Sequence, residues 1–194
     1  EGCFIGFGWG VFDVAVPAFA TQEGVQHRVA WIFAAFGAAT VVGGLLGGLV
    51  SKKLAPLLAL RRAYLLWLIA CVPVAFTYPD WSMALIGACI GFLGGAVQVF
   101  YFEVLEAVRP KGSQTASLGW IWSVEGSFMA LGAAVGGVVS ETFSPRVGLA
   151  MLPIMIFIGL IILSIGRARL SAANDVPTEE EDLQAMKDIS NESK

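Results

Sequence analysis

Six predominantly apolar segments of bilayer-spanning length, separated by short polar connections, constrain this chain more than any other feature. The expected spans are residues 2–20, 29–50, 63–77, 81–108, 113–140 and 147–165. A helix crosses the hydrocarbon core of a membrane with about 20 apolar residues. With a mean hydropathy of +0.75 and 14% charged residues, the chain lies outside the usual range of soluble domains. The predicted fold class is therefore an all-α membrane protein with six transmembrane helices.

The spans are expected to form one transmembrane lobe over residues 1–169, followed by an acidic, disordered cytoplasmic tail over residues 170–194. The tail has too few apolar groups to fold alone, and it supplies most of the net charge of −3. The expected surroundings are a lipid bilayer, and no nucleic-acid partner is expected. The chain begins with Glu1, almost directly at the first span, which favours a fragment of a longer polypeptide.

The basic residues are distributed unevenly between the two ends of the expected spans. One set of connections, together with the start of the tail, holds Lys52, Lys53, Arg61, Arg62, Arg109, Lys111, Arg167 and Arg169. The remaining connections hold only Arg28 and Arg146. Connections rich in lysine and arginine stay in the cytoplasm. The chain is therefore expected in a plasma (inner) membrane, with both of its ends on the cytoplasmic side.

Small residues recur in the same order in the two halves of the chain. The first span carries Gly2, Gly6 and Gly10 followed by Asp13, and the fourth carries Gly87, Gly91 and Gly95 followed by Gln98. The second carries Gly37-Ala38-Ala39 and Gly43-Gly44, and the fifth carries Gly132-Ala133-Ala134 and Gly136-Gly137. Since each half holds three spans, the second must cross the membrane in the opposite sense. The pattern predicts two inverted three-helix repeats, an arrangement typical of transporters.

Polar side chains inside the spans are the first candidates for a functional site. A charge near the bilayer centre costs about 2.5–3.5 kcal/mol on insertion scales, so Asp13 and Glu125 each either take part in coupling or bind a neighbouring helix. Gln98 is a candidate for substrate hydrogen bonding or for joining two helices. Glu103 is a candidate for a gate near the cytoplasm. Glu106 and Arg109, three residues apart, are expected to form an ion pair.

Aromatic residues on the first and fourth spans form a second group of candidates. Trp9, Phe12 and Tyr101 either line a cavity, where they would stack on a substrate ring, or pack in the interior. Trp120 and Trp122 fall on different faces of the fifth span, so at most one of them can face a cavity.

Several local phrases resemble the C-terminal six-helix half of a major facilitator superfamily (MFS) transporter. They are GFGWGVFDVAVPAFA, GAATVVGGLLGGLV with the basic connection after it, and VRPKGSQTASLGWIWSVEGSFMALGAAVGGVV. The resemblance covers Gly2 to about Arg169, although the loop Ser51–Arg62 lacks the full gating motif of that superfamily. It implies a missing N-terminal lobe of the same polypeptide and a cavity lined by the first and fourth spans.

The resemblance also implies that the second and fifth spans slide against the missing lobe. Their small residues are the candidates for that face: Gly37, Gly43, Gly44, Gly47, Gly132, Gly136 and Gly137. Small residues let two helices approach closely and shift without interlocking side chains.

Enzymatic chemistry is not expected from this sequence. Its single histidine, His27, lies in a connection, so no histidine-rich metal site or haem ligand pair is expected, and no cofactor. The predicted function is one lobe of a secondary active transporter that moves a small molecule by alternating access, coupled to a proton or another ion. The alternative hypothesis is a self-contained six-span pore or scaffold that oligomerises through its glycine-rich helices.

Overall fold

A computed structural model of the chain describes residues 1–51, 56–110 and 112–171, and within these ranges six helices meet the length and hydropathy of a membrane span. The α-helices are α1 (Gly2–Gln22), α2 (Val29–Ser51), α3 (Pro56–Cys71), α4 (Trp81–Val108), α5 (Gln114–Thr142) and α6 (Pro145–Ser171). Two short 3₁₀ segments are η1 (Gln26–Arg28) and η2 (Val72–Phe76). The acidic tail predicted from residue 170 lies almost entirely outside the described residues, as do Lys52, Lys53 and Lys111.

The third span begins earlier than the sequence pattern predicts. Pro56 starts α3, whereas the prediction placed residues 54–60 in a connection and began the span at residue 63. A proline is well suited to the first turn of a helix, where its missing N–H would have had no partner. The same chemistry explains the other end, because the α-helix gives way at Cys71 to the 3₁₀ turn that contains Pro73.

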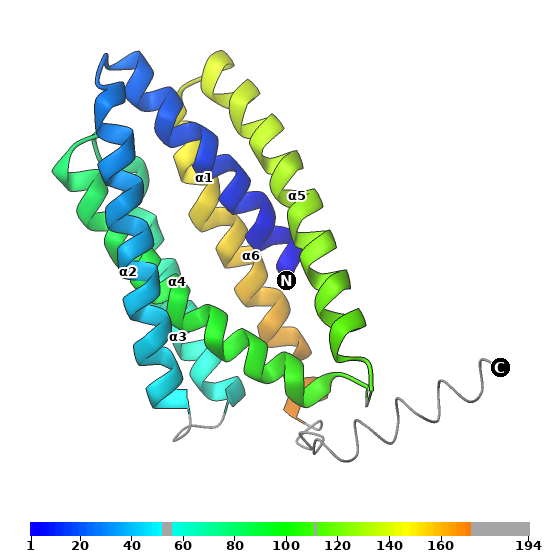
Figure 1. The fold of residues 1–194 in the computed structure, drawn as a ribbon. Helices are drawn as coiled ribbons and strands as arrows, with labels where there is room; N and C mark the ends of the chain where they lie inside the picture. Colours follow the sequence, from blue (N-terminus) through cyan, green and yellow to red (C-terminus); the bar gives the residue numbers. More distant parts are fainter. Residues whose placement is uncertain (52–55, 111, 172–194) are drawn as a thin grey trace.

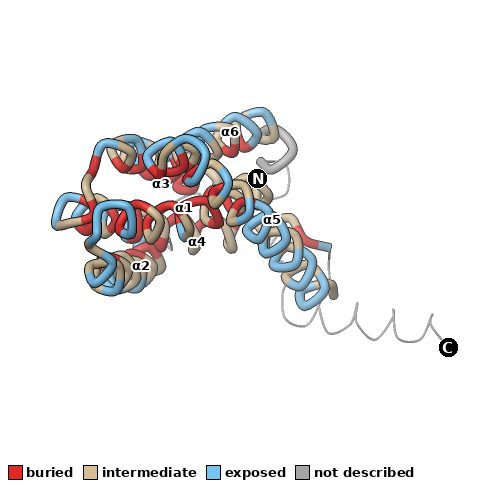
Figure 2. The backbone as a smooth tube through the Cα atoms, turned by 90° about the horizontal axis from the view of Figure 1, so that it is seen from above, coloured by how far each residue is buried: buried red, intermediate tan, exposed pale blue. Residues whose placement is uncertain are grey.

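The six helices are buried to different extents. Of the most apolar 18-residue stretch of each helix, 56% is buried in α1 and 44% is buried in α4, whereas only 11% is buried in α2 and in α5. Figure 2 shows the buried residues gathered on the inward faces and the exposed ones on the outer faces of the bundle. The two helices that carry glycine stripes therefore form the centre of the lobe.

The two triplets run in opposite directions and pack in the same way. In Figure 1, α1 ends where α4 begins, and α2 and α5 likewise run in opposite senses. The main packed pairs are α1 with α5 and α2 with α4, joined by α1 with α6 and α3 with α4. If α1, α2 and α3 are exchanged with α4, α5 and α6, the α1–α5 pair becomes α4–α2 and the α1–α6 pair becomes α4–α3. The contact pattern therefore confirms the inverted three-helix repeat.

Glycines bring α1 and α5 into backbone contact. A Cβ atom added at Gly6 would overlap the Glu125 carbonyl oxygen, one at Gly10 that of Met129, one at Gly132 that of Phe7, and one at Gly136 would lie 2.9 Å from Val11 Cα. No rotamer change relieves an overlap with backbone. This pair of helices therefore needs glycine at these positions.

The equivalent contacts join α4 and α2. A Cβ atom at Gly91 would overlap the Phe36 carbonyl oxygen, one at Gly95 that of Thr40, one at Gly43 that of Phe92, and one at Gly47 would lie 3.0 Å from Ala96 Cα. One constant offset in residue number relates α1 to α4 in all of these contacts, and another relates α2 to α5. The repeat therefore extends to individual residues, with Gly43 equivalent to Gly132 and Gly47 equivalent to Gly136.

This register corrects two sequence-based expectations. The pattern paired Gly37 with Gly132, but the structure makes Gly126 the counterpart of Gly37, and no described atom lies within 4 Å of a Cβ at either position. The glycines Gly43, Gly47, Gly132 and Gly136 do not form an outward sliding face, because they pack against α4 and α1 of the same lobe. Gly44 and Gly137 lie beside them and are only partly buried.

Candidate functional site

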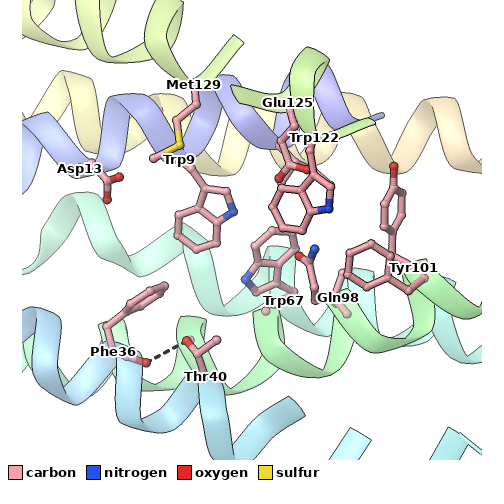
Figure 3. A pocket seen from close by; sticks show the side chains of 15 residues that line it. Trp9, Asp13, Phe36, Thr40, Trp67, Gln98, Tyr101, Trp122, Glu125 and Met129 are labelled. Carbon is pink, nitrogen blue, oxygen red and sulfur yellow. Dashed lines mark hydrogen bonds between the residues drawn. The ribbon is translucent and has the colours of Figure 1, made fainter. Parts of the chain in front are cut away.

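A cavity of about 390 Å³ opens between the two triplets at the level of the glycine contacts. Its lining includes Trp9 and Asp13 from α1, Phe36 and Thr40 from α2, Trp67 from α3, Gln98 and Tyr101 from α4, and Trp122, Glu125 and Met129 from α5. Figure 3 shows these side chains projecting toward one another from five helices. Ligand sites typically occupy about 300–1,000 Å³, so this cavity is large enough for a small molecule.

The two carboxylates reach the cavity because of the close packing of α1 and α5. The carbonyl oxygen of Glu125 itself lies against Gly6, and Asp13 follows Gly10 by about one helical turn. Asp13 is exposed and Glu125 is half-buried. Neither carboxylate has a hydrogen bond or an ion pair with another described residue. Both are thus available to an ion or a ligand.

The repeat places different chemistry on the opposite side of the cavity. The counterpart of Asp13 is Gln98, and the counterpart of Glu125 is Phe36, as the matched glycine contacts require. Both counterparts also line the cavity. The α1–α5 side therefore carries the acidic groups, whereas the α2–α4 side presents an amide and an aromatic ring at the equivalent positions.

Aromatic rings make up much of the remaining lining. The ring centroid of Trp9 lies 5.3 Å from that of Phe36 and 5.6 Å from that of Trp67. On the other side, Trp122 lies 6.1 Å from Phe102, measured between ring centroids. These are separations at which aromatic pairs attract one another. The cavity is thus bounded by rings that hold each other in place.

Trp67 is a cavity residue that the sequence reasoning missed. It comes from α3, which contains no glycine and whose charged residues, Arg61 and Arg62, precede Trp67 by more than one helical turn, so nothing in the pattern pointed it inward. A Cβ atom at Gly94 would lie 3.2 Å from Trp67 Nε1, so the absent side chain of Gly94 makes room for the indole. Gly94 adjoins the glycine stripe of α4 and is equivalent to Trp9 of α1. This additional glycine is the sequence feature that could have indicated a large neighbouring side chain.

Two predicted candidates lie elsewhere. Phe12 is 1% exposed and packs in the interior against Trp9, Phe33 and Phe36, because its position on α1 faces α2 and not the cavity. Glu103 is not among the residues lining the cavity; it is half-buried on α4, and its Oε2 atom has no hydrogen-bond partner among the described residues.

An ion pair lies at the C-terminal end of α4, outside the cavity. The predicted pair between Glu106 and Arg109 is present, with the guanidinium largely buried. Within the described ranges, no group of three or more histidine, cysteine, aspartate or glutamate side chains is placed to hold a metal ion.

Polar contacts join the connections where α1 meets α2 and α3 meets α4. The Tyr78 hydroxyl donates to Glu23 Oε2 at 2.9 Å, and this bond raises the pKa of the tyrosine. Asp80 caps α4 by accepting from the Ser82 backbone N–H at 2.7 Å, which holds the pKa of that carboxyl below its usual range. Arg146 donates to the Ala75 carbonyl oxygen at 3.2 Å. Two hydrogen bonds between segments distant in sequence therefore hold this end of the bundle together.

Comparison with protein families gives a match to the sequence model of the Major Facilitator Superfamily over residues 2–192. Comparisons with curated proteins and with solved structures give no significant match. The family match spans the whole six-helix lobe, and the inverted triplets and the membrane-spanning helices agree with it. The chain therefore belongs to the Major Facilitator Superfamily of membrane transporters.

Proposed function

We propose that this chain is one lobe of a secondary active transporter that moves a small molecule by alternating access, with the cavity as its substrate site. The observation that carries the proposal is the cavity itself, where α1, α4 and α5 bring Asp13, Gln98 and Glu125 together. Inverted repeats around a central site can exchange conformations, so one site is exposed to each side of the membrane in turn.

Asp13 and Glu125 are proposed as the coupling groups. A carboxylate in a membrane cavity can bind a proton on one side and release it on the other, and the described residues offer no cation that would hold either group permanently charged. Gln98 and Tyr101 would supply hydrogen bonds to the substrate.

The remaining lobe is part of the same proposal. The outer faces of α2 and α5 expose large apolar residues, including Val41, Leu45, Leu131 and Val138. A second six-helix lobe of the polypeptide would cover the cavity from this side. The chain would lie in the plasma membrane with both ends in the cytoplasm, as the basic connections predict.

The alternative, a self-contained pore or scaffold that oligomerises through its glycine-rich helices, has less support. Gly43, Gly47, Gly132 and Gly136 are the glycines of α2 and α5 that could serve such an association. These glycines are already in contact with α4 and α1 inside the lobe.

Proton movement in liposomes tests the proposal. The protein expressed from its complete reading frame is reconstituted with an internal pH dye and exposed to a panel of sugars, amino acids, organic anions and organic cations. We expect one class to cause proton flux, and Asp13→Asn or Glu125→Gln to reduce that flux about tenfold or more. Glu141→Gln, an exposed carboxylate farther along α5, serves as the control and should retain the flux. Full flux in both cavity variants would remove the coupling assignment.

A further inference from the structure

The charge of the cavity restricts what it can bind. Its lining holds two carboxylates, and none of its described lining residues is lysine, arginine or histidine. An anionic ligand would therefore meet two like charges without a compensating cation. A cationic ligand would supply the partner that Asp13 and Glu125 lack among the described residues.

The aromatic lining restricts the ligand further. Trp9, Phe36 and Trp67 form a contiguous group of rings, and Trp122 adds a fourth from α5. The face of an aromatic ring attracts a cation within about 6 Å, most strongly for tryptophan, and cages of such rings bind quaternary ammonium groups. A strongly hydrated inorganic cation would gain little from such a lining, whereas an organic cation would gain from both the rings and the carboxylates.

The broken symmetry of the repeat orients the ligand. On the α1–α5 side the two equivalent positions hold Asp13 and Glu125, and on the α2–α4 side they hold Gln98 and Phe36. Figure 3 shows Trp67 and Phe36 on the side away from the α1 and α5 backbones. The cationic group belongs beside the carboxylates, and an apolar or aromatic body belongs against Phe36 and Trp67.

We propose that this cavity binds an organic cation, a quaternary or protonated amine carrying an apolar or aromatic body, with its charge toward Asp13 and Glu125. The inference rests on the proposed function, because it names the substrate class of the same site. Competition between the cation and protons for the two carboxylates would then exchange one for the other across the membrane.

Direct binding tests the inference without requiring transport. The protein expressed from its complete reading frame is placed in nanodiscs at pH 8, and binding of phenyltrimethylammonium is measured after subtraction of empty nanodiscs. Two comparison probes are tert-butylbenzene, which has the same shape without the charge, and benzenesulfonate, which has the opposite charge. We expect phenyltrimethylammonium to bind about tenfold or more tightly than either.

Variants assign the binding to the cavity. Asp13→Asn and Glu125→Gln should each weaken phenyltrimethylammonium binding about tenfold, because a charge–charge attraction is lost, and leave tert-butylbenzene binding unchanged. Trp122→Leu should weaken it severalfold, whereas Trp120→Leu, at an exposed tryptophan outside the cavity lining, should not. Because Trp120 and Trp122 are both largely exposed on α5, neither substitution is expected to prevent folding.

The results separate this inference from the proposed function. Equal binding of the charged and uncharged probes, tighter binding of benzenesulfonate, or full binding in both acid variants would overturn the organic-cation inference. If another compound drives proton flux that depends on Asp13 and Glu125, the proposed function still stands. If the cation binds as predicted but no flux depends on these residues, the proposed coupling fails and the ligand class remains.

Discussion

Adding one methyl group at the centre of each triplet should measure how strictly the inverted repeat governs stability. At Gly10 a Cβ atom would overlap the Met129 carbonyl oxygen and lie 2.7 Å from the Ala133 backbone nitrogen. At the equivalent Gly95 it would overlap the Thr40 carbonyl oxygen and lie 2.8 Å from the Gly44 backbone nitrogen. Carbon atoms in good contact lie about 3.5–4.0 Å apart, so the helices must separate by about 1 Å or more.

That separation sets the expected magnitude. Overpacking a close contact costs about 1–3 kcal/mol, and here the obstructing atoms are backbone and cannot move alone. Gly10→Ala and Gly95→Ala should therefore each lower the free energy of unfolding by about 1–3 kcal/mol. Gly37→Ala and Gly126→Ala, whose Cβ atoms would meet no described atom within 4 Å, should change it by about 1 kcal/mol at most, toward greater stability.

Unfolding of the purified protein in mixed micelles, followed by circular dichroism as the denaturing detergent fraction rises, measures all four variants. Either of two results would show that the shared register does not govern stability. The first is that Gly10→Ala and Gly95→Ala are tolerated as well as the two control substitutions. The second is that one of them is costly and its counterpart is neutral, because the shared register predicts similar losses in both triplets.

Two further predictions concern the connections at the end where α1 meets α2. Tyr78→Phe should lower the free energy of unfolding by removing the hydrogen bond to Glu23, and a double-mutant cycle with Glu23→Gln should show that the two losses are not additive. Asp80→Ala should cost about 1 kcal/mol as the cap of α4 is lost, whereas Asp80→Asn should keep the cap. Because the Asp80 pKa is lowered in the folded protein, its contribution is present above the unfolded pKa of about 3.9 and is lost as the pH falls through the folded value. Between pH 6 and pH 3, the free energy of unfolding should therefore fall more steeply in the wild type than in Asp80→Asn. Parallel pH dependences in the two proteins would contradict the assignment of the cap to Asp80.

The fold was largely predictable because its strongest determinants are local. Apolar length identifies six spans, and the stripes Gly6–Gly10 and Gly91–Gly95 identify the two central helices. The residue-by-residue correspondence between α2 and α5 was not predictable. The sequence comparison aligned similar strings of small residues, whereas in the structure the equivalent residues are the glycines that contact the backbone of a partner helix. Gly37 resembles Gly132 in its neighbours, yet it meets open space.

The candidate site was predictable only where it follows from the stripes. Asp13 and Gln98 were identified by their position after a glycine stripe, and both line the cavity. Trp67 was missed because its inward direction depends on how α3 packs against α4, which no pattern within α3 records. For Phe12 the sequence left cavity lining and interior packing open, and the structure places it in the interior, facing α2. Successive helical residues are about 100° apart, so the adjacent Asp13 lines the cavity while Phe12 does not.

If Asp13 and Glu125 face water inside the membrane, cysteines at their positions should react with a water-soluble thiol reagent. In a background without Cys3, Cys71 and Cys89, Asp13→Cys and Glu125→Cys are treated with a membrane-impermeant thiol reagent, and Ile69→Cys, on the exposed face of α3, is the control. Only a hydrated thiol ionises and reacts readily. Labelling should be about tenfold or more faster at both cavity positions than at Ile69, whereas equally slow labelling at all three positions would show that the two carboxylates do not face water.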